Sequence, residues 1–103
     1  MQARRRRVKI IATLGPASSD RETIAALFAA GADVFRINMS HASHDVMRER
    51  VAMIRALEEE TGRPIGVLVD LQGPKLRLGA FADGGVDLRK GDIFALDSDP
   101  SAG

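Results

Sequence analysis

The chain has 103 residues, of which 45% are hydrophobic and 28% charged, a composition typical of globular rather than disordered proteins. It has no cysteine, which excludes disulfides and thiolate metal sites, and its net charge of +1 gives no general reason to expect nucleic acid. No apolar run approaches the roughly 20 residues of a membrane helix, and no signal-peptide stretch is present. We therefore expect a cytoplasmic protein without a membrane partner.

Residues 1–7 are expected to form a basic tail. Arg4 to Arg7 are consecutive arginines and could contact nucleic acid or an acidic surface. The chain has no Trp or Tyr on which bases could stack, so a solvated tail is the preferred interpretation.

Alternating apolar and helical patterns predict the order β-α-β-α-β with short connections. The first helix is expected to begin at Ser19, with Glu22 at capping-box spacing, and to stop at Gly31. The second helix is expected to run from residues 43–45 to Thr61. Strands are expected at residues 8–14, 33–38 and 65–70. Two right-handed crossovers would make these strands parallel in one sheet, so the fold class is α/β.

Each predicted strand turns polar at its carboxyl end, with Thr13 on the first and Asp70 on the third. On the second, the alternation of an extended chain puts Arg36, Asn38 and Ser40 on one face. Ligands bind at this end of parallel strands in open α/β sheets and barrels. The pattern predicts a polar pocket, and a strand that frays into a polar loop is the plain alternative.

After Gly73 and Pro74 the pattern changes to short strand candidates without helices, at residues 76–81, 86–88 and 93–96, separated by turn signals. We expect residues 8–78 to form one domain and residues 79–103 to begin a separate antiparallel β domain. Gly73 and Pro74 could be a hinge or a simple turn. Three parallel strands leave two open edges, so the chain is expected to be the N-terminal part of a larger protein.

Three motifs resemble the start of pyruvate kinase, in order and spacing. They are KIIATLGPAS at residues 9–18, FRINMSH at residues 35–41 and LVDLQGPKLRLG at residues 68–79. The resemblance spans residues 8–96. It implies the first three β/α units of a TIM (β/α)8 barrel with a β-barrel domain inserted after the third strand. It also implies phosphoryl transfer from phosphoenolpyruvate to ADP, giving pyruvate and ATP, with magnesium, in a full-length homotetramer.

The resemblance also implies site residues where the motifs match. Arg36 resembles the arginine that binds the transferring phosphate, and Arg77 resembles one that contacts the nucleotide phosphates. The segment Asn38, Met39, Ser40 and His41 matches the lining of the nucleotide site. The monovalent-cation site is matched by Asn38, Ser40, Asp70 and Leu71.

One departure from the potassium-dependent pattern concerns the cation site. Potassium-dependent members have Thr and Glu where this chain has Leu71 and Lys75, and the Leu and Lys pair resembles the potassium-independent branch. Lys75 could supply the positive charge that potassium would bring, or it could be a solvated loop lysine.

The family's catalytic lysine and magnesium ligands belong to later barrel strands, and no residue here matches them. We expect the isolated 103 residues to be inactive. One alternative is a non-catalytic, truncated protein that binds phosphate or a partner subunit. The last alternative is a nucleic-acid-binding protein that would use Arg4 to Arg7. His41 and His44, at a spacing of three, could form a metal pair, but a loop near nucleotide is preferred.

Overall fold

The computed structural model describes residues 4–99. These residues divide into two compact units, one extending to Gly73 and the other starting at Pro74. Among the described residues, no helix has the length and apolar character needed to cross a bilayer.

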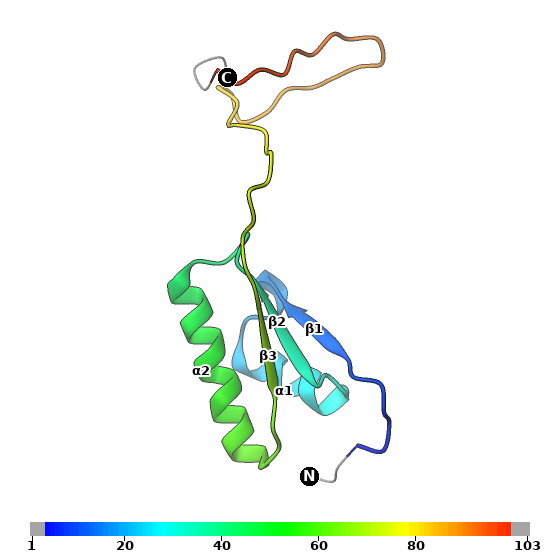
Figure 1. Cartoon of the computed structure of the whole chain (residues 1–103), viewed down its shortest axis with the longest axis vertical. Helices are drawn as coiled ribbons and strands as arrows, with labels where there is room; N and C mark the ends of the chain where they lie inside the picture. The colour runs from blue at the N-terminus through cyan, green and yellow to red at the C-terminus, as the bar shows by residue number, and fades with distance from the viewer. Residues whose placement is uncertain (1–3, 100–103) are drawn as a thin grey trace. The chain divides into compact units, whose positions relative to one another are not determined.

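The first unit is built from three strands and two α-helices in the predicted order (Figure 1). The strands pair in the order β1-β2-β3, and both pairings are parallel. A short 3-10 turn, η1, follows the first strand. The elements are β1 (Ile11–Leu14), η1 (Pro16–Ser18), α1 (Arg21–Ala30), β2 (Val34–Asn38), α2 (His44–Thr61) and β3 (Gly66–Asp70).

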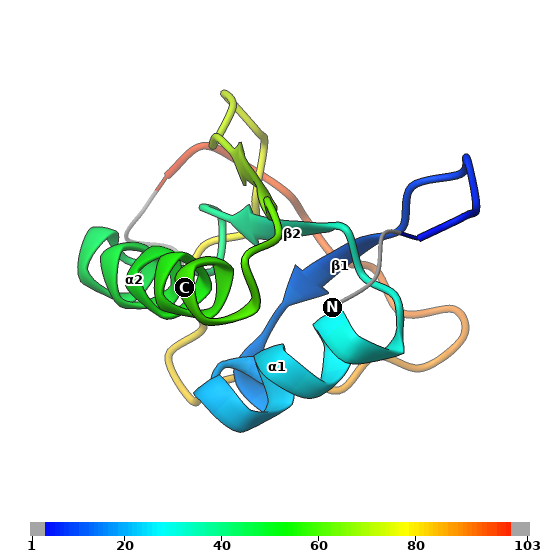
Figure 2. The ribbon, with the colours of Figure 1, turned by 90° about the horizontal axis from the view of Figure 1, so that it is seen from below.

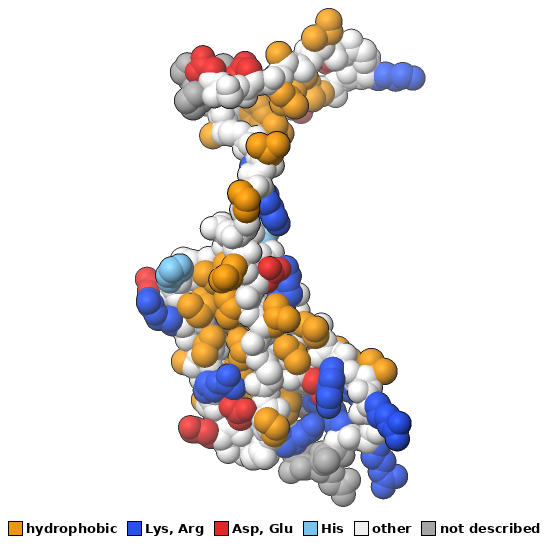
Figure 3. Space-filling view, in the orientation of Figure 1, with side chains coloured by type: hydrophobic (Ala, Val, Ile, Leu, Met, Phe, Trp, Pro, Cys, Tyr) orange, Lys and Arg blue, Asp and Glu red, His pale blue; other side chains and the backbone are white. Residues whose placement is uncertain are grey.

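Both helices lie on the same side of the sheet (Figure 2). Phe35 and Ile37 on β2 point to that side and are fully buried, because side chains alternate along a strand. The core formed with the helices also contains Leu14, Ile24, Phe28, Ala32, Ile54, Leu57 and Ile65. The other face of the sheet has no helix over it within the described residues, so Ile11 and Leu68 remain 53% and 41% exposed. Hydrophobic side chains are visible over the strands in Figure 3.

Helix boundaries follow local capping chemistry, with one correction. Asp20, and not Ser19, caps α1: its carboxylate accepts a hydrogen bond from the Thr23 N–H at 2.8 Å. A charged carboxylate is a strong N-cap. The predicted end at Gly31 is confirmed by its φ of 136°, a conformation that glycine adopts without strain. The predicted second helix is also confirmed, with Ser43 as its N-cap.

The first strand is shorter than predicted. Only residues Ile11–Leu14 are extended and paired, whereas Val8 and Ile10 precede the strand and are 74% and 47% exposed. The apolar run was expected to be a buried strand from residue 8. That expectation was wrong because only Ile10 in the first half of the run bonds to the neighbouring segment: its carbonyl accepts from the Asp33 and Val34 N–H groups.

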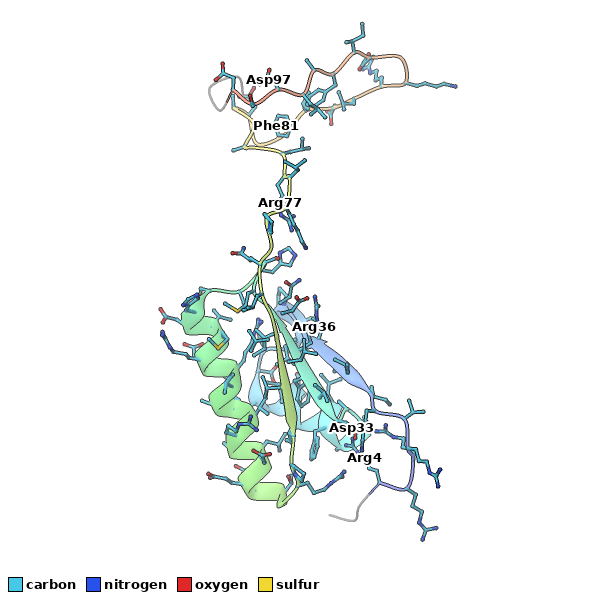
Figure 4. The ribbon with its side chains drawn as sticks, viewed as in Figure 1. Arg4, Asp33, Arg36, Arg77, Phe81 and Asp97 are labelled. Atoms are coloured by element: carbon cyan, nitrogen blue, oxygen red, sulfur yellow. The ribbon has the colours of Figure 1, made fainter. Side chains whose placement is uncertain are left out.

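The predicted solvated tail is also wrong for two of its arginines. Arg4 and Arg6 bind the Asp33 carboxylate at 2.6 and 2.8 Å, at the amino end of β2 (Figure 4). Arg4 also donates to the Gly31 and Ala32 carbonyls at 2.6 Å, and Arg6 contacts the Gly31 carbonyl. These contacts satisfy carbonyls left over at the end of α1, where positive charge is favourable. Residues 1–3 lie outside the described residues.

Asp33 is held in its ionised form by this cluster. The Ile10 N–H donates to its carboxylate at 2.8 Å. That bond, together with Arg6 and Arg4, lowers the pKa of Asp33 well below its ordinary value, against the opposing effect of burial. The cluster therefore fixes residues 4–6 at the amino end of β2. The opposite end of the sheet carries Thr13, Arg36, Asn38 and Asp70 at the carboxyl ends of the strands, and this end is called the polar rim.

The second unit has turns but no strand within residues 74–99. The three strand candidates of this region are therefore corrected: extended segments count as strands only when they pair, and here they do not. The predicted turns are present, with backbone hydrogen bonds from Gly84 to Phe81 and from Asp92 to Arg89. The rings of Phe81 and Phe94 pack with centroids 6.1 Å apart. Residues 100–103 of the predicted β domain lie outside the described residues.

Candidate functional site

The candidate site lies at the carboxyl ends of the three strands, where Arg36 is at its centre (Figure 4). Arg36 on β2 is the Cα partner of Thr13 on β1, and Asn38 is the partner of Asp70, the last residue of β3. Residues paired in a parallel sheet point to the same face, so these polar side chains share the face that lacks helices. The convergence expected from the sequence is present.

Arg36 is held in place by contacts on all three nitrogens of its guanidinium. Its Nε donates to Asp70 Oδ2 at 3.1 Å and its Nη2 contacts the same oxygen, while Nη1 donates to Thr13 Oγ1 at 3.3 Å. The Arg36 and Asp70 side chains are 31% and 45% exposed, so the pair is accessible to solvent and ligand.

The contacts of Arg36 leave a defined pair of donors. An arginine has five N–H groups, and the three contacts use one on each nitrogen. One N–H therefore remains on each of the terminal nitrogens, Nη1 and Nη2. Such a planar pair matches two oxygens of a phosphate or a carboxylate. Asp70 and Thr13 thus orient the guanidinium and leave two of its N–H groups for an anion.

A tight turn follows β2 and carries the remaining predicted residues. The Ser40 N–H donates to Asn38 Oδ1 at 3.1 Å, and the His41 N–H donates to the Asn38 carbonyl at 3.1 Å. The Met39 N–H donates to the Asp70 carbonyl at 2.9 Å, which ties this turn to the end of β3. The turn is therefore fixed relative to the Arg36–Asp70 pair.

The oxygens proposed for a monovalent cation are close in the fold but partly engaged. Asn38 and Asp70 are register partners, whereas Ser40 lies in the turn beyond the strand. Asn38 Oδ1 and Asp70 Oδ2 already accept hydrogen bonds, although oxygen acceptors have further lone pairs. The Leu71 side chain is 76% exposed and apolar, so only its backbone carbonyl could be a ligand. These oxygen donors suit a hard monovalent ion.

Lys75 and Arg77 belong to the second unit, where both are exposed. Their predicted roles beside the polar rim stay predictions. Within residues 4–99, no group of three His, Asp or Glu side chains is arranged to hold a metal ion, and this includes the surroundings of His41 and His44.

A pocket of about 360 Å³ adjoins the polar rim, where the carboxyl ends of β1 and β2 meet α2. It shares Thr13 and Asn38 with the polar rim. The pocket is lined by Thr13, Leu14, Gly15, Pro16, Asn38, His41 and Arg50. Apolar walls with a few polar groups are typical of small-molecule sites.

Arg50 is the site residue that sequence reasoning missed. It lies on α2, is only 8% exposed, and is the one buried charged residue in the described part of the chain. Its spacing of four from Ile54 and seven from Leu57 places it on the core face of the helix. An arginine at a core-facing position of a helix is the signal that could have identified it.

Comparison with known proteins gives a consistent result. The family model described as pyruvate kinase, barrel domain, matches residues 5–102. Pyruvate kinase from Methylorubrum extorquens is 60% identical over 100 residues, covering 97% of this chain and 21% of the relative. Pyruvate kinase 2 from Synechocystis sp. is 44% identical over 97 residues, covering 92% and 16%. Pyruvate kinase II from Salmonella typhimurium is 42% identical over 103 residues, covering 100% and 22%. The chain spans about a fifth of the length of these curated relatives.

Proposed function

Because the chain belongs to the pyruvate kinase family, we propose that it forms part of an enzyme that transfers the phosphoryl group of phosphoenolpyruvate to ADP, giving pyruvate and ATP. The observation that carries this proposal is the Arg36 guanidinium, which Asp70 and Thr13 hold while one N–H on each terminal nitrogen remains unused. Here "complete enzyme" means a full-length pyruvate kinase that contains this segment.

The architecture proposed for the complete enzyme is a β/α barrel. Two features of the first unit support it: the strands pair in sequence order, and both crossover helices lie on one side of the sheet. A doubly wound sheet would place helices on both faces, whereas a barrel keeps them all outside. In the barrel, Ile11 and Leu68 would face the interior, and the open edges of β1 and β3 would pair with further strands.

The role proposed for Arg36 is to bind the phosphoryl group during its transfer and to neutralise the negative charge on its oxygens. Phosphoryl transfer needs positioning and charge stabilisation more than covalent help from the protein. Two parallel N–H groups on a cation supply both, because they fix the phosphate orientation and offset the charge on its oxygens. Asp70 and Thr13 act through Arg36 by holding its orientation.

The nucleotide is proposed to lie along the turn from Asn38 to His41 and in the pocket beside it. Apolar walls formed by Leu14 and Pro16 suit a heterocyclic base, and the neighbouring turn supplies polar groups. Arg77 is proposed to bind the nucleotide phosphates from the second unit, as a guanidinium can do bidentately.

The monovalent-cation site is proposed to consist of Asn38, Ser40, Asp70 and the Leu71 carbonyl, with either potassium or the Lys75 ammonium supplying the charge. We expect the complete enzyme to be active in potassium-free buffer and the Lys75→Glu variant to require added potassium. Equal activity of both proteins without potassium would contradict the role of Lys75. Arg89→Glu, also in the second unit and exposed, is the matched control for a reversed charge.

Magnesium is proposed to be required for the reaction, but the described residues contain no acidic cluster that fits it. A homotetramer is proposed for the complete enzyme from its family membership.

The experiment that tests the proposed function measures pyruvate formation by the complete enzyme with phosphoenolpyruvate and ADP. Turnover that depends on both substrates is expected, and no turnover by a correctly folded protein would contradict the proposal. The isolated 103 residues are expected to give no measurable phosphoryl transfer, since they contain no match to the catalytic lysine. Turnover by the purified 103 residues would contradict the prediction that essential catalytic residues lie outside them.

A further inference from the structure

Arg50 has far fewer partners than a buried arginine normally has. Arg50 is only 8% exposed. Its one hydrogen bond to a described residue runs from Nη1 to the Leu14 carbonyl, at 3.5 Å. Its Nε is buried and has no hydrogen-bond partner. Burying a guanidinium without acceptors is costly, and buried charges in proteins are normally paired. Arg50 Nε therefore lacks an acceptor among the described residues.

The pocket beside Arg50 is able to receive such a group. Its polar side chains are those of Thr13, Asn38, His41 and Arg50, all of which can donate hydrogen bonds, and no carboxylate lines it. Leu14 and Pro16 provide apolar walls. The lining thus favours a flat, largely apolar ligand with acceptor atoms on its edge, as in a heterocyclic base.

The position of the pocket relative to Arg36 indicates which part of a nucleotide it would hold. Thr13 belongs both to the pocket and to the Arg36 cluster, because its Oγ1 accepts from Arg36 Nη1 at 3.3 Å. Arg36 is placed to bind a phosphoryl group, so the part of the pocket near Arg50 is left for the far end of a nucleotide. That far end is the base.

We propose that Arg50 binds the base of the nucleoside diphosphate, donating from its guanidinium to ring nitrogen or carbonyl acceptors. Guanidinium groups bind such acceptors at the edges of purines in other settings. The inference rests on the proposed function and adds to it a base-recognising residue on α2. By holding the Leu14 carbonyl, Arg50 also fixes the pocket wall against which the base would lie.

The test compares Arg50→Met and Arg50→Lys with wild type in the complete enzyme. We expect Arg50→Met to raise KM for ADP at least tenfold and to leave KM for phosphoenolpyruvate within twofold, with Arg50→Lys intermediate. Competitive inhibition by adenosine should weaken by the same factor as ADP, whereas inhibition by pyrophosphate should not change. Arg48→Met is the matched control, because Arg48 is on the same helix and its side chain is 70% exposed. It should behave as wild type.

Several outcomes would overturn the inference while leaving the proposed function intact. One is an active Arg50→Met enzyme with unchanged KM for ADP, whether or not its melting temperature falls, since that pattern marks a purely structural arginine. Another is weaker inhibition by pyrophosphate and not by adenosine, which would mean a phosphate contact. If neither variant folds, a crystal structure of the wild-type enzyme with ADP decides: a base acceptor within hydrogen-bond distance of Arg50 supports the inference, and a base elsewhere overturns it. Absence of pyruvate kinase activity in wild type would instead refute the proposed function.

Discussion

Replacing Arg36 by lysine separates the role of the guanidinium fork from the role of its charge. Lysine keeps one positive charge but loses the planar pair of N–H groups and the side-on contacts with Asp70 and Thr13. We therefore expect Arg36→Lys to bind and stabilise the transferring phosphoryl group poorly, although the local charge is unchanged.

The magnitude follows from the two free N–H groups. Hydrogen bonds to charged groups contribute about 1.5–3 kcal/mol each, and about 1.4 kcal/mol corresponds to a factor of ten. Losing both should cost roughly 3 kcal/mol or more, so kcat/KM for phosphoenolpyruvate should fall by at least ~10²-fold. The effect on stability should stay within about 1 kcal/mol, because the Arg36 and Asp70 side chains are 31% and 45% exposed.

The assay follows pyruvate formation by the complete enzyme at varied phosphoenolpyruvate concentration, together with thermal melting. Arg55→Lys is the control, since Arg55 also pairs with a carboxylate, that of Glu58 at 2.8 Å, but lies on α2 away from the rim. A kcat/KM for Arg36→Lys within threefold of wild type, at an unchanged melting temperature, would refute the role given to the fork.

Two further predictions concern stability. Since the Asp33 pKa is lowered in the folded state, its stabilisation is full above the ordinary value of 3.8 and is lost as pH falls below it. Asp33→Asn should therefore flatten the fall in melting temperature between about pH 5 and 2; an equally steep fall would contradict the arginine cluster. A Cβ on Gly66 would lie 2.9 Å from Val34 Cγ2. Gly66→Ala should therefore cost about 1–3 kcal/mol in denaturant unfolding, whereas Gly85→Ala, with open space around it, should not; equal effects would contradict that packing.

Features set by nearby residues were predictable from the sequence. Gly31 and Gly62 end the helices in left-handed conformations, and Ser43 caps α2, as their residue types indicate. The capping of α1 was misassigned between neighbouring residues, because Ser19 and Asp20 are both good caps. The parallel pairing of the strands followed from the alternation of elements and the handedness of crossovers.

Features set by distant partners were not predictable. Arg4 binds Asp33, which is 29 residues away, and nothing in the local pattern of the arginines distinguishes this contact from a solvated tail. The segments at residues 8–10, 76–81, 86–88 and 93–96 have strand-like composition, but a strand also needs a neighbour to pair with. Propensity alone does not supply that neighbour.

The candidate site was only partly predictable for the same reason. Alternation along β2 predicted that Arg36 and Asn38 share a face, and parallel register brought Asp70 to them. The resemblance to pyruvate kinase supplied roles but not the contact between Arg36 and Thr13, which depends on the register of β1. Arg50 was missed because helical spacing was used to find apolar residues, and a buried arginine breaks that pattern.

The most direct test of the account is a crystal structure of the complete enzyme with phosphoenolpyruvate or an unreactive analogue bound. We predict phosphate oxygens within about 3 Å of Nη1 and Nη2 of Arg36, with Asp70 still bound at the Nε side. A phosphate bound elsewhere, or an Arg36 whose terminal nitrogens contact only protein, would contradict it.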